Sequence, residues 1–170
     1  VEKSKNTIAW KLFDTIGTHT CLNYLLKMDF KKIVDTDYVP AASLGGLTYG
    51  VSSYEMASAY ATLENSGVYR NPTCILKITD DDGNIILDNT ASETRQVFKE
   101  TTAYLLTNAM QDTLIRGTGT AANFSGMPTA GKTGTATDNL DVWFCGYTPY
   151  YTATTWTGYD DNNAELSGAG

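Results

Sequence analysis

Residues 126–135 read GMPTAGKTGT, a run of glycine and threonine around one lysine. From Gly126 to Thr133 this run satisfies the phosphate-loop pattern G-x-x-x-x-G-K-[ST]. A phosphate loop follows a buried strand and opens a helix, because the amides at the helix N-terminus hold the phosphates. Residues 121–125 (AANFS) form no apolar strand, and residues 134–139 (GTATDN) have poor helix propensity. We therefore expect a strand at this lysine rather than a nucleotide site.

The C-terminal segments contain apolar and small polar residues separated by short turns, as expected of antiparallel hairpins. Before them we expect an amphipathic helix at about 100–115 and a hairpin at about 73–88 that turns at Asp82-Gly83. The N-terminal part of the chain, at about 1–70, is expected to be mainly helical. The expected strands, within about 128–160, are 128–136, 141–148 and 152–159. Helices followed by a small antiparallel sheet indicate an α+β fold, and we assign the whole chain to a single partial domain.

Start and stop signals predict the individual helices of the N-terminal part. Apolar residues recur at three- and four-residue spacing over residues 8–16, and Gly17 ends that helix. A second short helix is expected at about 22–28. Ser52, followed three positions later by Glu55, predicts a capping box at the start of another helix.

The composition excludes several classes of function. Twelve Lys and Arg residues against 19 Asp and Glu give a net charge of −7, so we expect no nucleic-acid partner. The chain is 42% hydrophobic, which is typical of a globular protein, and has no run of about 18 apolar residues to cross a bilayer. The three cysteines form no C-x-x-C pair and His19 is the single histidine, so we expect neither a metal nor a cofactor.

Small residues surround Lys132 and predict an edge strand whose backbone another chain can approach closely. Such a strand can hold a peptide by main-chain hydrogen bonds, while threonine hydroxyls and the lysine face a bound carboxylate. The sequence Ser4-Lys5-Asn6 opens the chain just before a helix. This S-x-N pattern is the partner of Lys-Thr-Gly in penicillin-recognising acyl transferases.

The whole chain resembles the later part of the transpeptidase domain of bifunctional, class A penicillin-binding proteins. The matching stretches are residues 4–7 (SKNT), 44–46 (LGG), 51–57 (VSSYEMA), 59–62 (AYAT), 67–69 (GVY), 116–122 (RGTGTAA), 130–135 (AGKTGT), 141–144 (DVWF), 146–149 (GYTP) and 158–160 (GYD). The resemblance covers nearly all of the chain. It implies a truncated form of the fold shared by penicillin-binding protein transpeptidases and serine β-lactamases.

The function that the resemblance implies is the cross-linking of peptidoglycan stem peptides by acyl transfer. A serine attacks the acyl-D-Ala-D-Ala bond to form an acyl-enzyme, and an amine from a second stem then accepts the acyl group. The implied partners are a stem peptide ending in D-Ala-D-Ala and β-lactam antibiotics, which trap the acyl-enzyme. The full-length protein is implied to be tethered to the cell membrane on its outer side.

The resemblance also implies a role for each matched site residue. Ser4 relays a proton toward the leaving amine, with Lys132 holding the hydrogen-bond network in its charged pattern. Asn6 contacts the amide backbone of the substrate. The residues implied to bind substrate are Thr133, Gly134 and Thr135. The two threonine hydroxyls bind the terminal carboxylate, and the N–H of the second threonine forms half of the oxyanion hole, whose loss typically costs about 3 kcal/mol.

One departure from the family pattern concerns the nucleophile, which lies in an S-x-x-K motif. None of the serines in the chain has a lysine three positions later; Ser4, for example, has Thr7 there. We therefore expect the motif to lie before Val1 in a longer protein, and this chain not to acylate by itself. The strands and final helix that complete the family's sheet are also expected to be missing, so the strand at 152–159 is expected to self-associate through an unpaired edge.

Two alternative functions remain open from the sequence. One is a serine β-lactamase or carboxypeptidase relative, against which the stretches at 116–122 and 141–160 argue. The other is a nucleophile-free module that senses peptidoglycan or β-lactam without turnover. The sequence before Val1 separates this second alternative from an enzyme, because the S-x-x-K motif is either present there or not.

Overall fold

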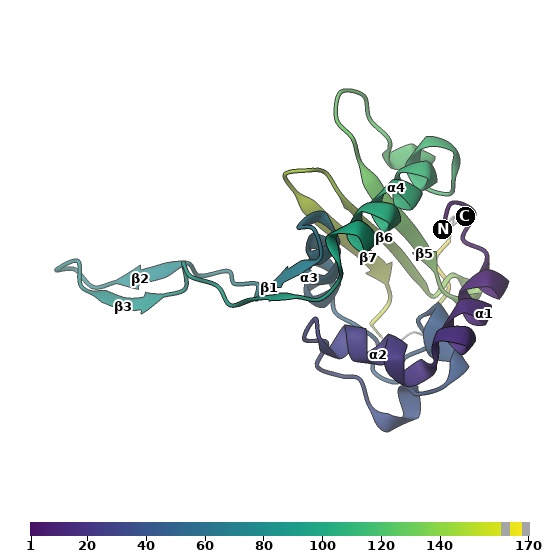
Figure 1. Cartoon of the computed structure of the whole chain (residues 1–170), viewed down its shortest axis with the longest axis horizontal. Coiled ribbons are helices and arrows are strands. Elements are labelled where there is room, and N and C mark those ends of the chain that lie inside the picture. Colours follow the sequence, from purple (N-terminus) through teal and green to yellow (C-terminus); the bar gives the residue numbers. More distant parts are fainter. Residues whose placement is uncertain (161–163, 168–170) are drawn as a thin grey trace.

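The computed structural model describes residues 1–160 and 164–167 (Figure 1). Its helices are α1 (Asn6–Ile16), α2 (Thr18–Leu26), α3 (Ser53–Glu64) and α4 (Glu100–Arg116). Its strands are β1 (Val68–Arg70), β2 (Lys77–Thr79), β3 (Ile85–Asp88), β4 (Thr94–Gln96), β5 (Ala130–Thr135), β6 (Asp141–Tyr147) and β7 (Thr152–Gly158). Short 3-10 turns are η1 (Asp35–Asp37), η2 (Pro40–Leu44), η3 (Thr120–Ala122) and η4 (Thr137–Asn139). The α+β fold class is confirmed.

The C-terminal strands form an antiparallel sheet in the order β5-β6-β7. Lys132 of β5 lies opposite Cys145 of β6, which in turn lies opposite Thr154 of β7. β5 is therefore at one edge of this sheet, as the small residues around Lys132 predicted. The lysine is followed by strand rather than by a helix N-terminus, so the geometry required by the phosphate-loop alternative is not present.

Helices α3 and α4 cover the sheet and supply the core beneath it (Figure 1). Met110 of α4 is buried against Ala130 and Tyr147, which are paired across β5 and β6, and Tyr60 and Leu63 of α3 pack against the same cluster. Each large apolar side chain buried in this way contributes about 1.5–3 kcal/mol. This packing fixes the position of β5 relative to α4.

The ends of the helices follow local chemistry. Ser52 Oγ accepts a hydrogen bond from the N–H of Glu55 at 3.2 Å, and the Glu55 carboxylate accepts one from the N–H of Ser52 at 2.8 Å, so the predicted capping box is confirmed. The prediction of a second helix at 22–28 was wrong in its bounds. Gly17 ends α1 with φ of +94°, and α2 begins at once with a polar first turn that the apolar pattern did not reveal.

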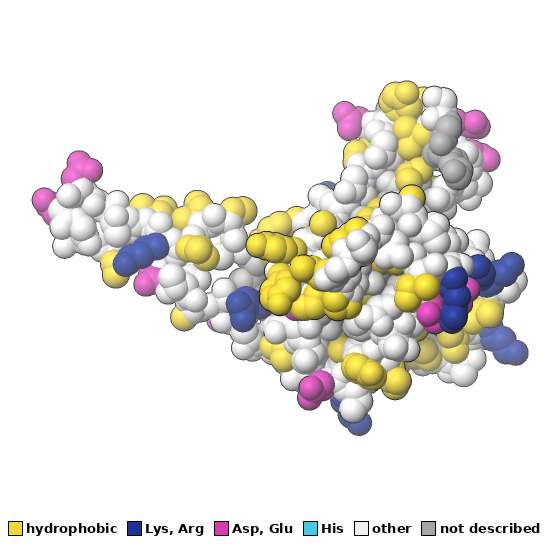
Figure 2. Space-filling model, turned by 90° about the horizontal axis from the view of Figure 1, so that it is seen from above, with side chains coloured by type: hydrophobic (Ala, Val, Ile, Leu, Met, Phe, Trp, Pro, Cys, Tyr) yellow, Lys and Arg dark blue, Asp and Glu magenta, His cyan; other side chains and the backbone are white. Residues whose placement is uncertain are grey.

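The hairpin of β2 and β3 projects from the body as an arm, which we define as residues 75–89 (Figure 1). Its turn is closed by the Asp80 carboxylate, which accepts hydrogen bonds from the N–H groups of Asn84 at 2.7 Å and Asp82 at 3.1 Å. Apolar side chains lie along the arm and acidic ones at its tip (Figure 2). The predicted turn at Asp82-Gly83 is confirmed, with Gly83 at φ of +84°.

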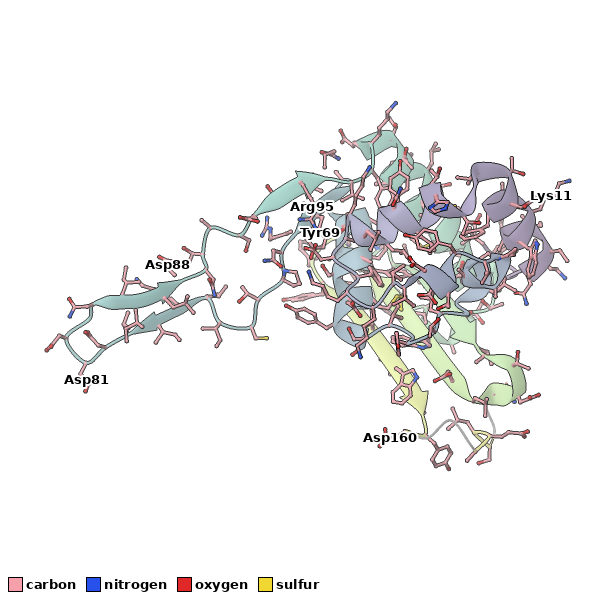
Figure 3. All side chains as sticks on the ribbon, turned by 90° about the horizontal axis from the view of Figure 1, so that it is seen from below. Lys11, Tyr69, Asp81, Asp88, Arg95 and Asp160 are labelled. Atoms are coloured by element: carbon pink, nitrogen blue, oxygen red, sulfur yellow. The ribbon has the colours of Figure 1, made fainter. Side chains whose placement is uncertain are left out.

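A second, shorter ribbon of β1 and β4 forms the base of the arm and was not predicted from the sequence. The Arg95 side chain lies beside Tyr69 (Figure 3), with its guanidinium 4.3 Å from the centre of the Tyr69 ring. It also forms an ion pair with Asp29 at 2.7 Å. Strands of three residues are too short to produce a recognisable alternation. The contacts of Arg95 join residues that are far apart in the sequence.

Candidate active site

The structure brings Ser4 and Lys132 into direct contact. The Lys132 amine donates a hydrogen bond to the Ser4 hydroxyl at 2.7 Å and another to the Thr133 carbonyl at 2.6 Å. Ser4 lies in a turn closed by its own N–H, which donates to the carbonyl of Val1 at 3.1 Å. Its φ of +48° is in the left-handed region, which is uncommon for serine. Asn6, the first residue of α1, follows two positions later and is exposed.

The backbone of β5 is open along the edge that faces away from β6. The N–H of Ala136 donates to the carbonyl of Asp141 at 2.9 Å, and hydrogen-bonded pairs alternate along an antiparallel ladder. The even-numbered residues of β5 therefore bond to β6, while the N–H and C=O groups of Thr133 and Thr135 point toward the edge without a neighbouring strand. An extended peptide can pair with such an edge.

The charged form of Lys132 is disfavoured relative to that of a lysine in water. The side chain is half-buried, and this burial lowers the pKa of Lys132 from its ordinary value. None of the ion pairs between described residues includes Lys132. An amine with a lowered pKa at hydrogen-bond distance from a hydroxyl can exchange a proton with it. The Ser4–Lys132 pair is therefore chemically suited to proton transfer.

The remaining residues expected to bind substrate lie on the same strand. The Thr133 hydroxyl is 2.6 Å from the hydroxyl of Thr118, whereas the Thr135 side chain is exposed. A Cβ at Gly134 would lie 3.3 Å from the Cβ of Trp143, so glycine leaves room on that face. Sequence reasoning gave Thr118 no role. The glycines on either side of it were the available signal of a loop held close to other backbone.

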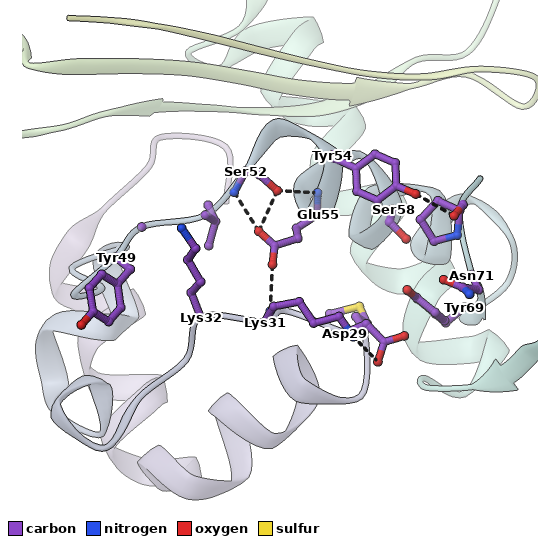
Figure 4. A pocket seen from close by; sticks show the side chains of 14 residues that line it. Asp29, Lys31, Lys32, Tyr49, Ser52, Tyr54, Glu55, Ser58, Tyr69 and Asn71 are labelled. Atoms are coloured by element: carbon purple, nitrogen blue, oxygen red, sulfur yellow. Dashed lines mark hydrogen bonds and ion pairs between the residues drawn. The ribbon is translucent and has the colours of Figure 1, made fainter. Parts of the chain in front are cut away.

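A cavity of about 400 Å³ lies elsewhere, beside the start of α3 (Figure 4). None of the residues that the sequence assigned to the site lines this cavity. The carboxylate of Glu55 is already engaged, because it accepts hydrogen bonds from the N–H groups of Ser52 and Lys31, each at 2.8 Å. We therefore do not assign the acyl-transfer chemistry to it.

Within residues 1–160 and 164–167, no three His, Cys, Asp or Glu side chains gather closely enough to hold a metal ion. The described helices include none with the length and apolarity needed to span a membrane. The three cysteines are free thiols. Burial raises the pKa of Cys145 to about 11, which makes that thiol a poor nucleophile at neutral pH.

Comparisons with known proteins show what the chain is similar to. The family described as the penicillin binding protein transpeptidase domain matches residues 1–168. Penicillin-binding protein 1A of Clostridium acetobutylicum is 39% identical over 160 residues, which are 93% of this chain and 20% of that protein. Penicillin-binding protein 4 of Bacillus subtilis is 38% identical over 159 residues, which are 94% of this chain and 25% of that protein. The chain thus spans about a fifth to a quarter of the length of these relatives.

A solved structure shows the same fold. The crystal structure of penicillin-binding protein 1A from Haemophilus influenzae superposes with a TM-score of 0.81 at 24% sequence identity. The match covers 99% of this chain and 30% of that one. The arrangement of helices and antiparallel strands described above is therefore shared with a longer protein of known structure.

Proposed function

The chain belongs to the penicillin-binding protein transpeptidase family, and on that premise we propose that it forms the C-terminal part of a domain that cross-links peptidoglycan. The substrate is a stem peptide that ends in D-Ala-D-Ala, and β-lactam antibiotics occupy the same site. The observation that carries this proposal is the hydrogen bond between Lys132 and Ser4 beside an open strand edge. In the full-length protein this site acts outside the cytoplasmic membrane, to which the protein is tethered.

In the proposed reaction a serine oxygen attacks the penultimate D-Ala carbonyl, and the C–N bond to the terminal D-Ala breaks. The leaving amine takes a proton through Ser4, which the neighbouring Lys132 keeps hydrogen-bonded. An amine of a second stem then attacks the acyl-enzyme, forms the new C–N bond and releases the serine. The nucleophilic serine belongs to an S-x-x-K motif, which is not found among the 170 residues, so we place it in another part of the full-length protein.

The remaining residues bind the substrate in this proposal. The hydroxyls of Thr133 and Thr135 bind the terminal carboxylate, and Gly134 lets the peptide approach the strand. The outward-facing N–H of Thr135 donates to the oxyanion, an interaction of a type worth about 3 kcal/mol. Asn6 contacts the substrate amide. The open edge of β5 and the exposure of Thr135 and Asn6 support these roles.

The test is covalent labelling of the full-length protein with a labelled penicillin. We expect labelling to be lost in Lys132→Ala and retained in Lys11→Ala, a matched change at an exposed lysine on α1. Labelling of a folded Lys132→Ala variant at the wild-type rate would contradict the proposed role. Labelling followed by hydrolysis, with no transfer to an amine, would instead favour a β-lactamase or carboxypeptidase. Reversible binding without any label would favour a sensing module.

We also propose that the isolated chain self-associates through β7. Among the described residues β7 pairs only with β6, so its other edge leaves backbone N–H and C=O groups without strand partners. A second copy can pair with that edge. Sedimentation over a wide concentration range should show a dimer that dissociates on dilution, and a monomer at every concentration would contradict this expectation.

A further inference from the structure

The residues that precede Ser4 are held on the C-terminal end of α4. The Arg116 guanidinium contacts the Glu2 carboxylate at 3.2 Å and the Asp112 carboxylate at 2.8 Å. The Lys3 amine donates to the Arg116 carbonyl at 2.6 Å, and the N–H of Thr118 donates to the Glu2 carbonyl at 3.3 Å. These contacts involve both side chains and backbone, so they fix the turn itself and not only its surface.

Gly117 allows this close approach. A Cβ at this position would lie 2.5 Å from the Glu2 carbonyl oxygen and 2.6 Å from the Cα of Thr113. Both neighbours are backbone atoms, so neither could rotate away. The turn before Ser4 is therefore packed directly against the backbone of residues 116–118.

The same loop is attached to the strand that carries Lys132. The hydroxyls of Thr118 and Thr133 are 2.6 Å apart, one residue from the lysine. Residues 116–118 thus contact the Ser4 turn on one side and β5 on the other. A bridge of three residues therefore connects the Ser4 turn to the strand of Lys132, in addition to the hydrogen bond between the Ser4 and Lys132 side chains.

We propose that residues 116–118 act as a spacer that holds the Ser4 hydroxyl against the Lys132 amine, with Arg116 and Glu2 as positioning residues. Neither residue touches the substrate in the proposed reaction; each acts through the Ser4 turn. The inference extends the proposed function, because proton transfer requires the donor and acceptor within about 2.6–3.2 Å of each other. Ser4 also has a positive φ, a conformation that persists only when the surrounding contacts hold it.

The test uses this chain labelled with ¹³C in its lysines, and follows the Lys132 Cε signal through a pH titration. In the wild type Lys132 should titrate below the ordinary lysine value because it is half-buried. Releasing the Ser4 turn admits water, so Glu2→Ala and Arg116→Ala should both raise its midpoint. The controls are Glu93→Ala and Arg70→Ala, matched changes at exposed residues outside the contacts of the Ser4 turn. They should leave the Lys132 midpoint unchanged.

Simple charge effects predict a different result, which makes the test decisive. Removing the negative Glu2 would lower the midpoint of Lys132, and removing the positive Arg116 would raise it. The spacer proposal is supported if the Lys132 midpoint rises in both variants. It is overturned if that midpoint falls or stays unchanged in Glu2→Ala. If Arg116→Ala fails to fold, the result for Glu2→Ala is sufficient, because Glu2 lies in the N-terminal turn. Penicillin labelling plays no part in this readout, so the spacer and the proposed function can fail separately.

Discussion

The Lys132 amine lies 2.7 Å from the Ser4 hydroxyl, although 128 positions separate the two residues in the chain. Lys132 is placed by the pairing of β5 with β6, and Ser4 by a turn packed on the end of α4. The contact therefore depends on the sheet and on the end of α4 together rather than on one element. Replacing either residue tests its role in the chemistry, while other replacements test the supporting fold.

Ser4→Ala should slow acylation of the full-length protein by labelled penicillin. Loss of a positioned proton donor typically lowers the rate roughly 10²–10⁴-fold. The rate constant of label incorporation measures the effect, with Ser92→Ala as a control on the loop after the arm. An unchanged rate in a folded Ser4→Ala variant would show that the leaving amine takes its proton from elsewhere.

Folding stability should increase with pH in the alkaline range because of Lys132. Burial lowers the folded-state pKa of this lysine below the unfolded value of about 10.4, so the unfolded chain binds more protons between these two values. The wild type should gain stability relative to Lys132→Met as the pH rises through that window. Urea unfolding at several pH values measures this difference. A constant difference between the two proteins across the window would contradict the lowered pKa.

Asp37→Asn should destabilise the chain by about 2 kcal/mol at pH 7. The buried carboxylate accepts hydrogen bonds from the Thr48 hydroxyl and N–H, each at 2.7 Å, and from the Val34 N–H at 2.9 Å. The Thr48 hydroxyl, followed by the Val34 N–H, holds the pKa of Asp37 below its ordinary value. The stability that ionised Asp37 contributes is present above its unfolded-state pKa of about 3.9. It is lost as the pH falls through the folded-state pKa.

Denaturant unfolding at pH 7 and at successively lower pH measures this contribution. The difference in free energy of unfolding between wild type and Asp37→Asn should become smaller as the pH falls below about 4. Asp35→Asn, an exposed carboxylate in the same 3-10 turn, is the control and should cost little. If this difference stays constant down to the pH of acid unfolding, the charge of Asp37 contributes nothing to stability.

Gly67→Ala should destabilise the chain more than Gly83→Ala does. Both glycines have a positive φ, +82° and +84°, which costs an alanine about 1–2 kcal/mol. A Cβ on Gly67 would also overlap the backbone carbonyl of Phe98, whereas a Cβ on Gly83 meets nothing at the tip of the arm. Thermal unfolding of the two variants compares these effects, and equal losses would contradict the packing at Gly67.

Much of the fold could be predicted from local sequence patterns. The helix predicted at 100–115 and the three C-terminal strands occur within one or two residues of their predicted bounds. Their signals are periodicity and turn residues, which act between neighbours in the chain. The bounds of α2 were missed because its first turn is polar, and the ribbon of β1 and β4 because its strands are too short to show a pattern.

The residues proposed for the site were visible in the sequence, but the contacts that support them were not. Lys132 and Ser4 belong to short motifs whose residue types suit the proposed acyl transfer. Glu2 and Arg116 drew no attention individually, since a carboxylate and a guanidinium 114 positions apart give no sign of contact. The lowered pKa of Lys132 likewise arises from burial, which depends on what packs around it.

The amino-acid sequence by itself indicated the type of each major element, the edge position of the lysine-bearing strand and the residues proposed for the site. These properties follow from backbone propensity and side-chain chemistry, which act over a few residues. The three-dimensional packing was needed to show that the Ser4 turn rests on Arg116. It also places the Ser4 hydroxyl against Lys132, a proximity that the family resemblance had implied. Segments far apart in the sequence meet because α4 packs against the sheet. A local sequence pattern, which involves only neighbouring residues, does not specify such a contact.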